Sequence, residues 1–240
     1  MILELENVSK SYDQSKTPVP VLHDITMSVE EGEDLASMGP SGSGKTTLMN
    51  LLGCLDVPSS GTYRLAGQDI GSLSDDELAD IRNRKIGFVF QNFYLMPKMT
   101  AIDNVMLPLL YRGVPLKDRR IRATAALKLV GLEDRMDFYP NQLSGGQCQR
   151  GAIARAIVGS PKLLLADEPT GALDTAAGVQ VMEIFRRLSN RGITIVMITH
   201  EPGIAACADK TYHILDGELF TDGKPEAGHS DPGEEADHEA

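Results

Sequence analysis

Hydrophobic residues along the chain fall into short runs separated by glycine-rich or polar turns. The runs predict strands over residues 3–8, 21–29, 35–38, 63–65, 86–90, 163–166 and 193–199. Helices are expected at residues 44–53 and 145–158, and between the last two strands, where Val181, Ile184, Phe185 and Leu188 form one core-facing stripe. Residues 93–159 are helical in character but more irregular. This alternation predicts an α/β fold with a parallel sheet, flanking helices and a separate helical lobe.

Composition allows a packed core and argues against several classes of protein. The sequence has 240 residues, 42% of them hydrophobic, which suits one domain or two small ones. Its longest apolar stretches are far shorter than the roughly 20 residues that cross a bilayer. Cys54, Cys148 and Cys207 are odd in number and widely spaced, which favours reduced thiols over a disulfide or zinc framework.

The net charge of −11 is unevenly distributed. Nine acidic residues and one lysine lie between Asp216 and Ala240, so the preceding residues are nearly balanced. We expect a domain over residues 1–222 and an acidic, solvated tail over residues 223–240. An acidic chain is a poor candidate for binding nucleic acid, and no nucleic-acid partner is predicted.

A glycine-rich loop between a predicted strand and a predicted helix has the pattern G-x-x-x-x-G-K-[ST]. Its residues are Gly39, Pro40, Ser41, Gly42, Ser43, Gly44, Lys45 and Thr46. In such a loop, backbone N–H groups and a helix N-terminus surround phosphate oxygens. Lys45 would reach the β- and γ-phosphates, and the Thr46 hydroxyl would bind Mg²⁺. The alternative is a Gly/Ser loop that carries a lysine by chance, which the strand–loop–helix context disfavours.

Two acidic residues end the apolar strand at 163–166. Asp167 would lie beside the metal, and Glu168 would lie nearer the γ-phosphate and its attacking water. Taken alone, the pair could be a strand that stops at solvated acids. Together with the phosphate loop, it predicts a nucleoside triphosphatase that uses Mg²⁺.

The segment Leu143–Gln147 (LSGGQ) supplies a second phosphate-binding device, in which Ser144 caps a helix and Gly145 and Gly146 let an anion approach. With it, residues 1–220 resemble the ATP-binding domain of ABC transporters. That resemblance implies a P-loop NTPase core, a small antiparallel β subdomain and a helical subdomain inserted at about 93–160. It also implies an ATPase in which Ser144, Gly145, Gly146 and Gln147 of one subunit close over ATP on the phosphate loop of another.

Further site residues follow from the resemblance alone. Tyr12 would stack on adenine, and residues from Ser41 to Thr47 would wrap the phosphates. Gln91 would reach the metal and the water, together with Thr46 and Asp167 as metal-site residues. Glu168 would polarise the water, with Lys45, Gln91 and His200 also acting in catalysis. His200 would contact the γ-phosphate, and Asp174 would lie in the loop that contacts the second subunit.

The local sequence at residues 49–56, 87–93, 104–105 and 108–109 resembles the macrolide-exporter and lipoprotein-release ATPases. The implied assembly is a homodimer that drives two permease subunits on separate chains, held at the cytoplasmic side of the cell membrane. Residues 93–110 are the expected contact with the permease. A regulatory ABC ATPase that controls cell-wall remodelling or division remains an alternative. An ABC ATPase of DNA repair or translation is disfavoured by the single cassette, the lack of a long heptad run and the acidic charge.

Overall fold

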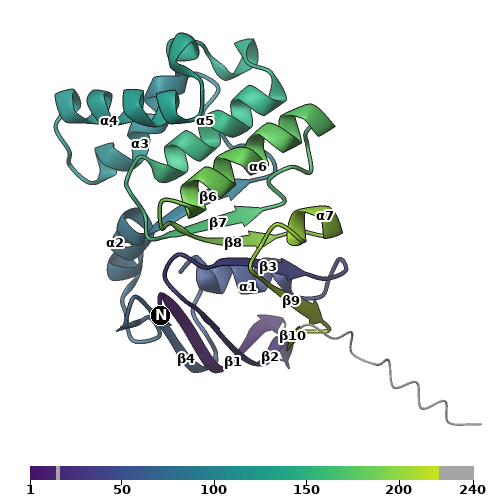
Figure 1. The fold of residues 1–240 in the computed structure, drawn as a ribbon. Coiled ribbons are helices and arrows are strands. Elements are labelled where there is room, and N and C mark those ends of the chain that lie inside the picture. The colour runs from purple at the N-terminus through teal and green to yellow at the C-terminus, as the bar shows by residue number, and fades with distance from the viewer. Residues whose placement is uncertain (15–16, 222–240) are drawn as a thin grey trace, which may run out of the picture.

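The computed structural model describes residues 1–14 and 17–221, which form two sheets with helices around them (Figure 1). The larger sheet has six strands in the order β10-β9-β3-β8-β7-β6. Its strands are β3 (Asp34–Met38), β6 (Ile86–Phe90), β7 (Leu163–Asp167), β8 (Thr194–Ile198), β9 (Lys210–Leu215) and β10 (Glu218–Thr221). All its pairings are parallel except that of β9 with β10. The predicted α/β fold with a parallel sheet is confirmed.

The second sheet is antiparallel and has four strands in the order β2-β1-β4-β5. They are β1 (Leu3–Gln14), β2 (Thr17–Val29), β4 (Ser60–Leu65) and β5 (Gln68–Asp69). The strands β1 and β2 extend beyond their predicted bounds, because the ladder between them continues through register shifts past Val8. Periodicity does not reveal such irregular pairing, since a shift exchanges the faces on which side chains lie.

Helices cover both faces of the larger sheet, as Figure 1 shows. The first helix, α1 (Lys45–Leu52), lies on the side of the antiparallel sheet and shares a hydrophobic core with it. On the other side are α3 (Ala101–Tyr111), α4 (Leu116–Leu129), α5 (Gly145–Ile157) and α6 (Thr175–Ser189), which enclose a second core. The predicted apolar stripe of α6 is buried there. The described residues also form three short helices: the 3₁₀ helices Glu133–Arg135 and Pro140–Gln142, and α7 (Pro202–Ala205).

The helix α2 (Asp75–Lys85) was not predicted. Its sequence is mostly charged, and it buries Leu78 and Ile81 alone, so it has no apolar stripe to mark it. It does carry a capping box, in which Ser74 and Glu77 bond each other's backbone N–H groups. The S-x-x-E pattern was therefore the available signal.

One buried amide anchors the loop before α3. Asn104 is fully buried, and its Oδ1 accepts from the Met96 N–H at 2.6 Å. Its Nδ2 donates to the carbonyls of Met96, Met99 and Thr100 at 3.0–3.2 Å. These bonds satisfy the buried amide, and together they hold the loop against the helix that follows it.

Across residues 1–14 and 17–221, no helix is long and apolar enough to cross a membrane. The expected helical subdomain at about 93–160 coincides with α3, α4 and α5, but the division of the chain into subdomains stays a prediction. The acidic tail predicted at 223–240 lies outside the described residues.

Asp34 opens β3 as a partly buried carboxylate. Its Oδ1 is buried with no hydrogen-bond partner in the described part of the chain. Burial, and then the charge of Asp209, raise the pKa of Asp34 to about 6. The folded protein therefore holds this proton more tightly than the unfolded chain, whose aspartate pKa is about 3.9. The contribution of Asp34 to stability is therefore fully present below about pH 4 and is lost as the pH rises through about 6.

We expect Asp34→Asn to stabilise the protein above pH 7, because the amide never has to ionise in this setting. After allowance for solvent screening, the gain in the free energy of unfolding should be on the order of 1 kcal/mol. Urea denaturation at pH 8 and at pH 5 measures it, and the gain should shrink at the lower pH. A gain that is equal at both values would contradict the assignment.

Candidate functional site

A hollow of about 610 Å³ opens at the carboxyl ends of the parallel strands, beside the N-terminus of α1. Most of the predicted phosphate and catalytic residues line it: Gly39, Pro40, Ser41, Gly42, Gly44, Lys45, Thr46, Thr47, Gln91, Asp167, Glu168 and His200. Ser43 is the exception within the loop, since its side chain is buried and points away from solvent. Val21 of β2 also lines the hollow, and it was not predicted, because a lone valine in a strand carries no functional pattern.

Two glycines let the loop pack closely against neighbouring strands. A Cβ at Gly39 would lie 2.2 Å from the carbonyl oxygen of Ile214 in β9. Gly44, directly before α1, has φ of +105°, and a Cβ there would lie 2.9 Å from the Leu22 side chain. Glycine is required at both positions, because a side chain would displace the loop from the sheet.

The Lys45 ammonium lies within the loop itself. It donates to the carbonyl oxygens of Gly39 and Pro40, at 2.7 Å in each case. These neutral acceptors leave the positive charge directed into a small space beside the first N–H groups of α1. A polyanion suits such a site electrostatically.

Glu168 lies at the edge of the hollow in a strained backbone conformation, with φ of +46°. Its N–H donates to Ile198 O at 2.9 Å, which continues the β7–β8 ladder by one residue. His200 donates to the Glu168 carboxylate through its backbone N–H at 3.1 Å, and its Nδ1 lies 2.7 Å from the same oxygen. This hydrogen bond raises the pKa of His200. The Thr199 hydroxyl donates to the other oxygen at 3.3 Å, a contact that sequence reasoning missed.

The residues predicted to hold a metal lie together in the hollow. Thr46, Gln91 and Asp167 offer a hydroxyl, an amide and a carboxylate, which are the oxygen ligands that Mg²⁺ prefers. Burial, and then the charge of Glu168, raise the pKa of Asp167, so a nearby cation would favour its ionised form. The described residues contain no cluster of three His, Cys, Asp or Glu side chains that could bind a metal alone. A nucleotide-bound Mg²⁺ that keeps several waters fits this donor set.

The predicted signature Ser144–Gln147 lies elsewhere. Ser144 caps α5: its N–H donates to the Gln147 side chain at 2.9 Å, and its Oγ accepts from the Gln147 N–H at 3.3 Å. A Cβ at Gly146 would lie 2.8 Å from the side chain of Ala177, so α5 and α6 begin side by side. Asp174 caps α6 by accepting from the Ala177 N–H at 2.8 Å. None of these residues lines the hollow of the same chain, as far as the described residues show.

A buried glutamine links α5 to the segment that follows Glu168. Gln149 is fully buried in α5, and its Nε2 donates to the Pro169 carbonyl at 2.7 Å. Pro169 follows Glu168 directly. Sequence reasoning missed this residue, because a lone glutamine in a helix carries no distinctive pattern.

Tyr12 of β1 does not line the hollow. Its hydroxyl donates to Asp56 Oδ2 at 2.9 Å, and the Lys10 ammonium lies 4.9 Å from the centre of its ring. Its predicted contact with adenine remains a prediction.

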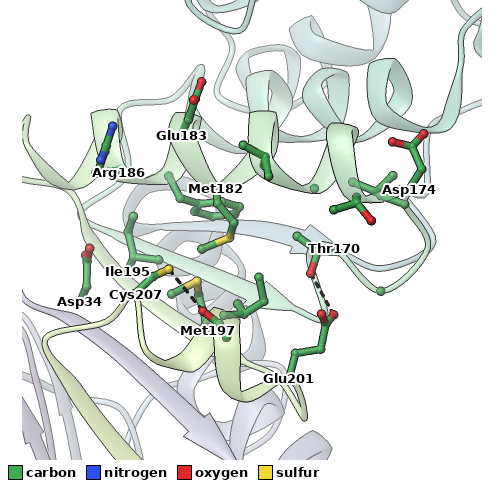
Figure 2. A pocket seen from close by; sticks show the side chains of 18 residues that line it. Asp34, Thr170, Asp174, Met182, Glu183, Arg186, Ile195, Met197, Glu201 and Cys207 are labelled. Carbon is green, nitrogen blue, oxygen red and sulfur yellow. Dashed lines mark hydrogen bonds between the residues drawn. The ribbon is translucent and has the colours of Figure 1, made fainter.

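Two further hollows lie away from the phosphate loop. One of about 750 Å³ separates α6 from α7, with an apolar floor that includes Met182 and Met197 (Figure 2). At one end, the Thr170 hydroxyl donates to Glu201 at 3.1 Å and so joins the segments that follow Glu168 and His200.

The other hollow, of about 600 Å³, lies between β6, α2 and α3. It is lined by Phe88, Pro108, Tyr94 and Tyr111, and the last two are 59% and 80% exposed. This exposed aromatic surface falls within or next to residues 93–110, the segment expected to contact a permease.

Known proteins match this chain over most of its length. The ABC transporter family matches residues 22–171. An uncharacterised ABC transporter ATP-binding protein of Bacillus subtilis (strain 168), YvrO, is 54% identical over 95% of this chain and 100% of its own. The macrolide export ATP-binding/permease protein MacB of Syntrophobacter fumaroxidans is 51% identical over 95% of this chain. The match spans 32% of that relative's length.

The fold agrees with these matches. The dimeric structure of the ATP-binding cassette MJ0796, in a post-hydrolysis state bound to ADP and Pi, has a TM-score of 0.83 and 41% identity. The match covers 92% of this chain and 98% of that one. The fold, the phosphate-loop hollow and these relatives together lead to one conclusion: the chain belongs to the ABC transporter family and is an ATP-binding subunit of that family.

Proposed function

We propose that this chain hydrolyses ATP with Mg²⁺ in a head-to-tail pair of copies and thereby drives separate membrane subunits of an exporter or lipoprotein-release system. The observation that carries the proposal is the position of Glu168. This carboxylate lies at the edge of the hollow formed by the Lys45 loop and is held there by His200 and Thr199.

The chemistry follows from the groups around the hollow. ATP phosphates would lie against the loop N–H groups, and their charge would draw the Lys45 ammonium from its two carbonyl acceptors. Glu168 would accept a proton from the water whose oxygen attacks the γ-phosphorus. The bond between that phosphorus and the bridging oxygen breaks, and ADP and phosphate form. His200, as a donor beside Glu168, would orient the γ-phosphate.

Mg²⁺ would be held by Thr46, Gln91 and Asp167 together with the nucleotide. When bound, it would neutralise the charge that develops on the phosphate oxygens. The support within this chain is that all three of these oxygen donors line the same hollow.

The proposed pairing rests on the separation of two anion-binding surfaces. The signature Ser144–Gln147 lies at the start of α5, away from the hollow of its own chain. A second copy placed head to tail would bring its signature over the nucleotide, with Asp174 at the contact. The dimeric MJ0796 cassettes, at 41% identity, support such a pair.

The membrane partner is proposed from the aromatic hollow at Tyr94 and Tyr111. Exposed aromatic side chains around a concave surface suit an apolar or amphipathic segment of another protein. Relatives such as MacB are named as combined ATP-binding and permease proteins, which supports a permease as the partner. We infer two permease copies, one for each ATPase, and a location at the cytoplasmic side of the membrane.

The cargo class is proposed at the level of subgroup. Relatives named for macrolide export, at about 50% identity, favour export over import. A neighbouring reading frame for a permease with four spans and a large extracytoplasmic domain would support the macrolide and lipoprotein-release subgroup. A partner of cell-wall remodelling there would favour the regulatory alternative.

Glu168→Gln is expected to retain ATP binding and to lower turnover at least about 100-fold, because an amide cannot accept the proton. The ATP-bound pair should accumulate, as measured by size-exclusion chromatography. Chelation of divalent metal with EDTA should likewise abolish hydrolysis by the unchanged chain. Glu183→Gln, an exposed substitution on α6, is the matched control. Normal turnover by Glu168→Gln would reject its assigned role.

Ser144→Arg is expected to block turnover while a single copy still binds a fluorescent ATP analogue. Ser74→Arg is the control, because Ser74 also caps a helix through a capping box and its loss should destabilise the fold by a similar amount, about 1 kcal/mol. Mixing the inactive Ser144→Arg and Glu168→Gln chains should restore turnover, since each mixed pair contains one intact site. No restoration would contradict a site shared between copies.

Tyr111→Glu is expected to reduce co-purification with the permease at least about five-fold, because it places a charge on the aromatic surface. Ile121→Glu is a suitable control, since Ile121 is 59% exposed on α4 and lies outside that hollow. Thermal unfolding of both variants checks that the fold is kept. Equal recovery of permease with both variants would place the docking surface elsewhere.

A further inference from the structure

Tyr12 is held at its hydroxyl by a partly buried acid. The hydroxyl donates to Asp56 Oδ2 at 2.9 Å. Lys10, which is 8% exposed, donates to Asp56 Oδ1 at 2.5 Å and to the Val57 carbonyl at 2.9 Å. The Val57 N–H adds a third bond to Asp56 at 2.8 Å. One carboxylate thus joins β1 to the segment that follows α1.

The Lys10 ammonium also lies over the ring of Tyr12, 4.9 Å from its centre. This contact and the hydroxyl bond restrain the ring at one face and one end. Burial opposes ionisation of Asp56, but the bonds from Lys10, the Val57 N–H and Tyr12 lower its pKa overall. The three-residue cluster Lys10–Tyr12–Asp56 therefore stays charged and intact at neutral pH.

Asp56 is itself rigidly placed. Its N–H and that of Leu55 donate to the Asn50 carbonyl at 3.3 and 2.8 Å, near the end of α1. Arg82 donates to the Cys54 carbonyl at 2.6 Å and so pins the same turn from α2. A carboxylate on so many backbone supports can hold a neighbouring ring in one orientation.

Tyr12 lies near the phosphate hollow, because it pairs with Val19 of β2, two residues before Val21, which lines that hollow. Burial, and then the bond to Asp56, raise the pKa of Tyr12, while the neighbouring Thr47 hydroxyl lowers it. Thr47 lines the hollow directly after the residues of the phosphate loop. A nucleotide whose phosphates occupy the loop would therefore carry its base toward the side of the site where Tyr12 stands.

We propose that Asp56, assisted by Lys10, is a positioning residue that holds the Tyr12 ring for contact with the base of the nucleotide. The inference rests on the proposed ATP-binding function. Asp56 is not among the residues that line the phosphate hollow, so we expect it to act on affinity for the base and not on the chemical step. A planar ring that is already oriented loses little freedom when a base stacks on it.

The test separates base from phosphate by comparing ATP with inorganic tripolyphosphate, which has no base. Tyr12→Phe keeps the ring and the Lys10–Asp56 pair but removes the hydrogen bond from the ring to Asp56. We expect it to raise KM for ATP about three- to ten-fold with kcat unchanged. Asp56→Asn should act in the same direction. Neither variant should alter the inhibition constant of tripolyphosphate.

Two further variants complete the set. Tyr12→Ala should raise KM for ATP more, about 5- to 100-fold, because the whole stacking surface is lost. Asp69→Asn, an exposed carboxylate in β5 of the same sheet, should change neither constant. Asp56→Asn leaves Lys10 buried without its charged partner, so Tyr12→Phe is the decisive variant if Asp56→Asn folds poorly.

The outcomes distinguish the alternatives. If Tyr12→Ala weakens ATP binding and Tyr12→Phe does not, the positioning role of Asp56 is overturned, while the contact between the Tyr12 ring and the base stands. If Tyr12→Ala has no effect, both are overturned. If Tyr12→Phe weakens the binding of ATP and of tripolyphosphate equally, the effect is a structural one on the phosphate loop, and the positioning role of Asp56 is overturned. Absence of ATP hydrolysis by the unchanged chain would reject the proposed function instead.

Discussion

The parallel pairing of four strands is the constraint on which the rest of the structure depends. Ser37 of β3 lies opposite Ile198 of β8, Ile198 opposite Asp167 of β7, and Asp167 opposite Phe90 of β6. Residues that follow these positions must therefore leave the sheet at one edge, where the phosphate loop, Glu168 and Gln91 meet. A slip of one residue in any pair would turn its side chains to the opposite face and dismantle the site.

Charge at this edge is balanced locally, whatever the total for the chain. The acids Asp167 and Glu168 are adjacent; burial and then the charge of Glu168 raise the pKa of Asp167, and the Lys45 ammonium offsets part of this rise. Neutral carbonyls, not carboxylates, hold Lys45 in place. The net charge of −11 thus says little about affinity for a polyanion, because a helix N-terminus and one lysine dominate at short range.

Much of the fold and most of the hollow could be predicted from sequence, since buried parallel strands and a glycine-rich loop have strong local patterns. The helix α2 could not be predicted from periodicity, because it buries two side chains alone. Gln149, Thr199 and Asp56 were missed for another reason. Their roles depend on partners 20, 31 and 44 residues away, and no local pattern records such distances.

The bond from Gln149 to Pro169 has a consequence for a pair of copies. It joins the helix that begins at the signature to the segment that carries Glu168, so within one chain these two parts shift together. In the proposed head-to-tail pair they would serve different nucleotides. Binding of nucleotide at one site would then bias the geometry of the other site, and thermodynamic linkage requires that bias to be mutual. In the proposed pair, a single buried amide would thus couple the two sites.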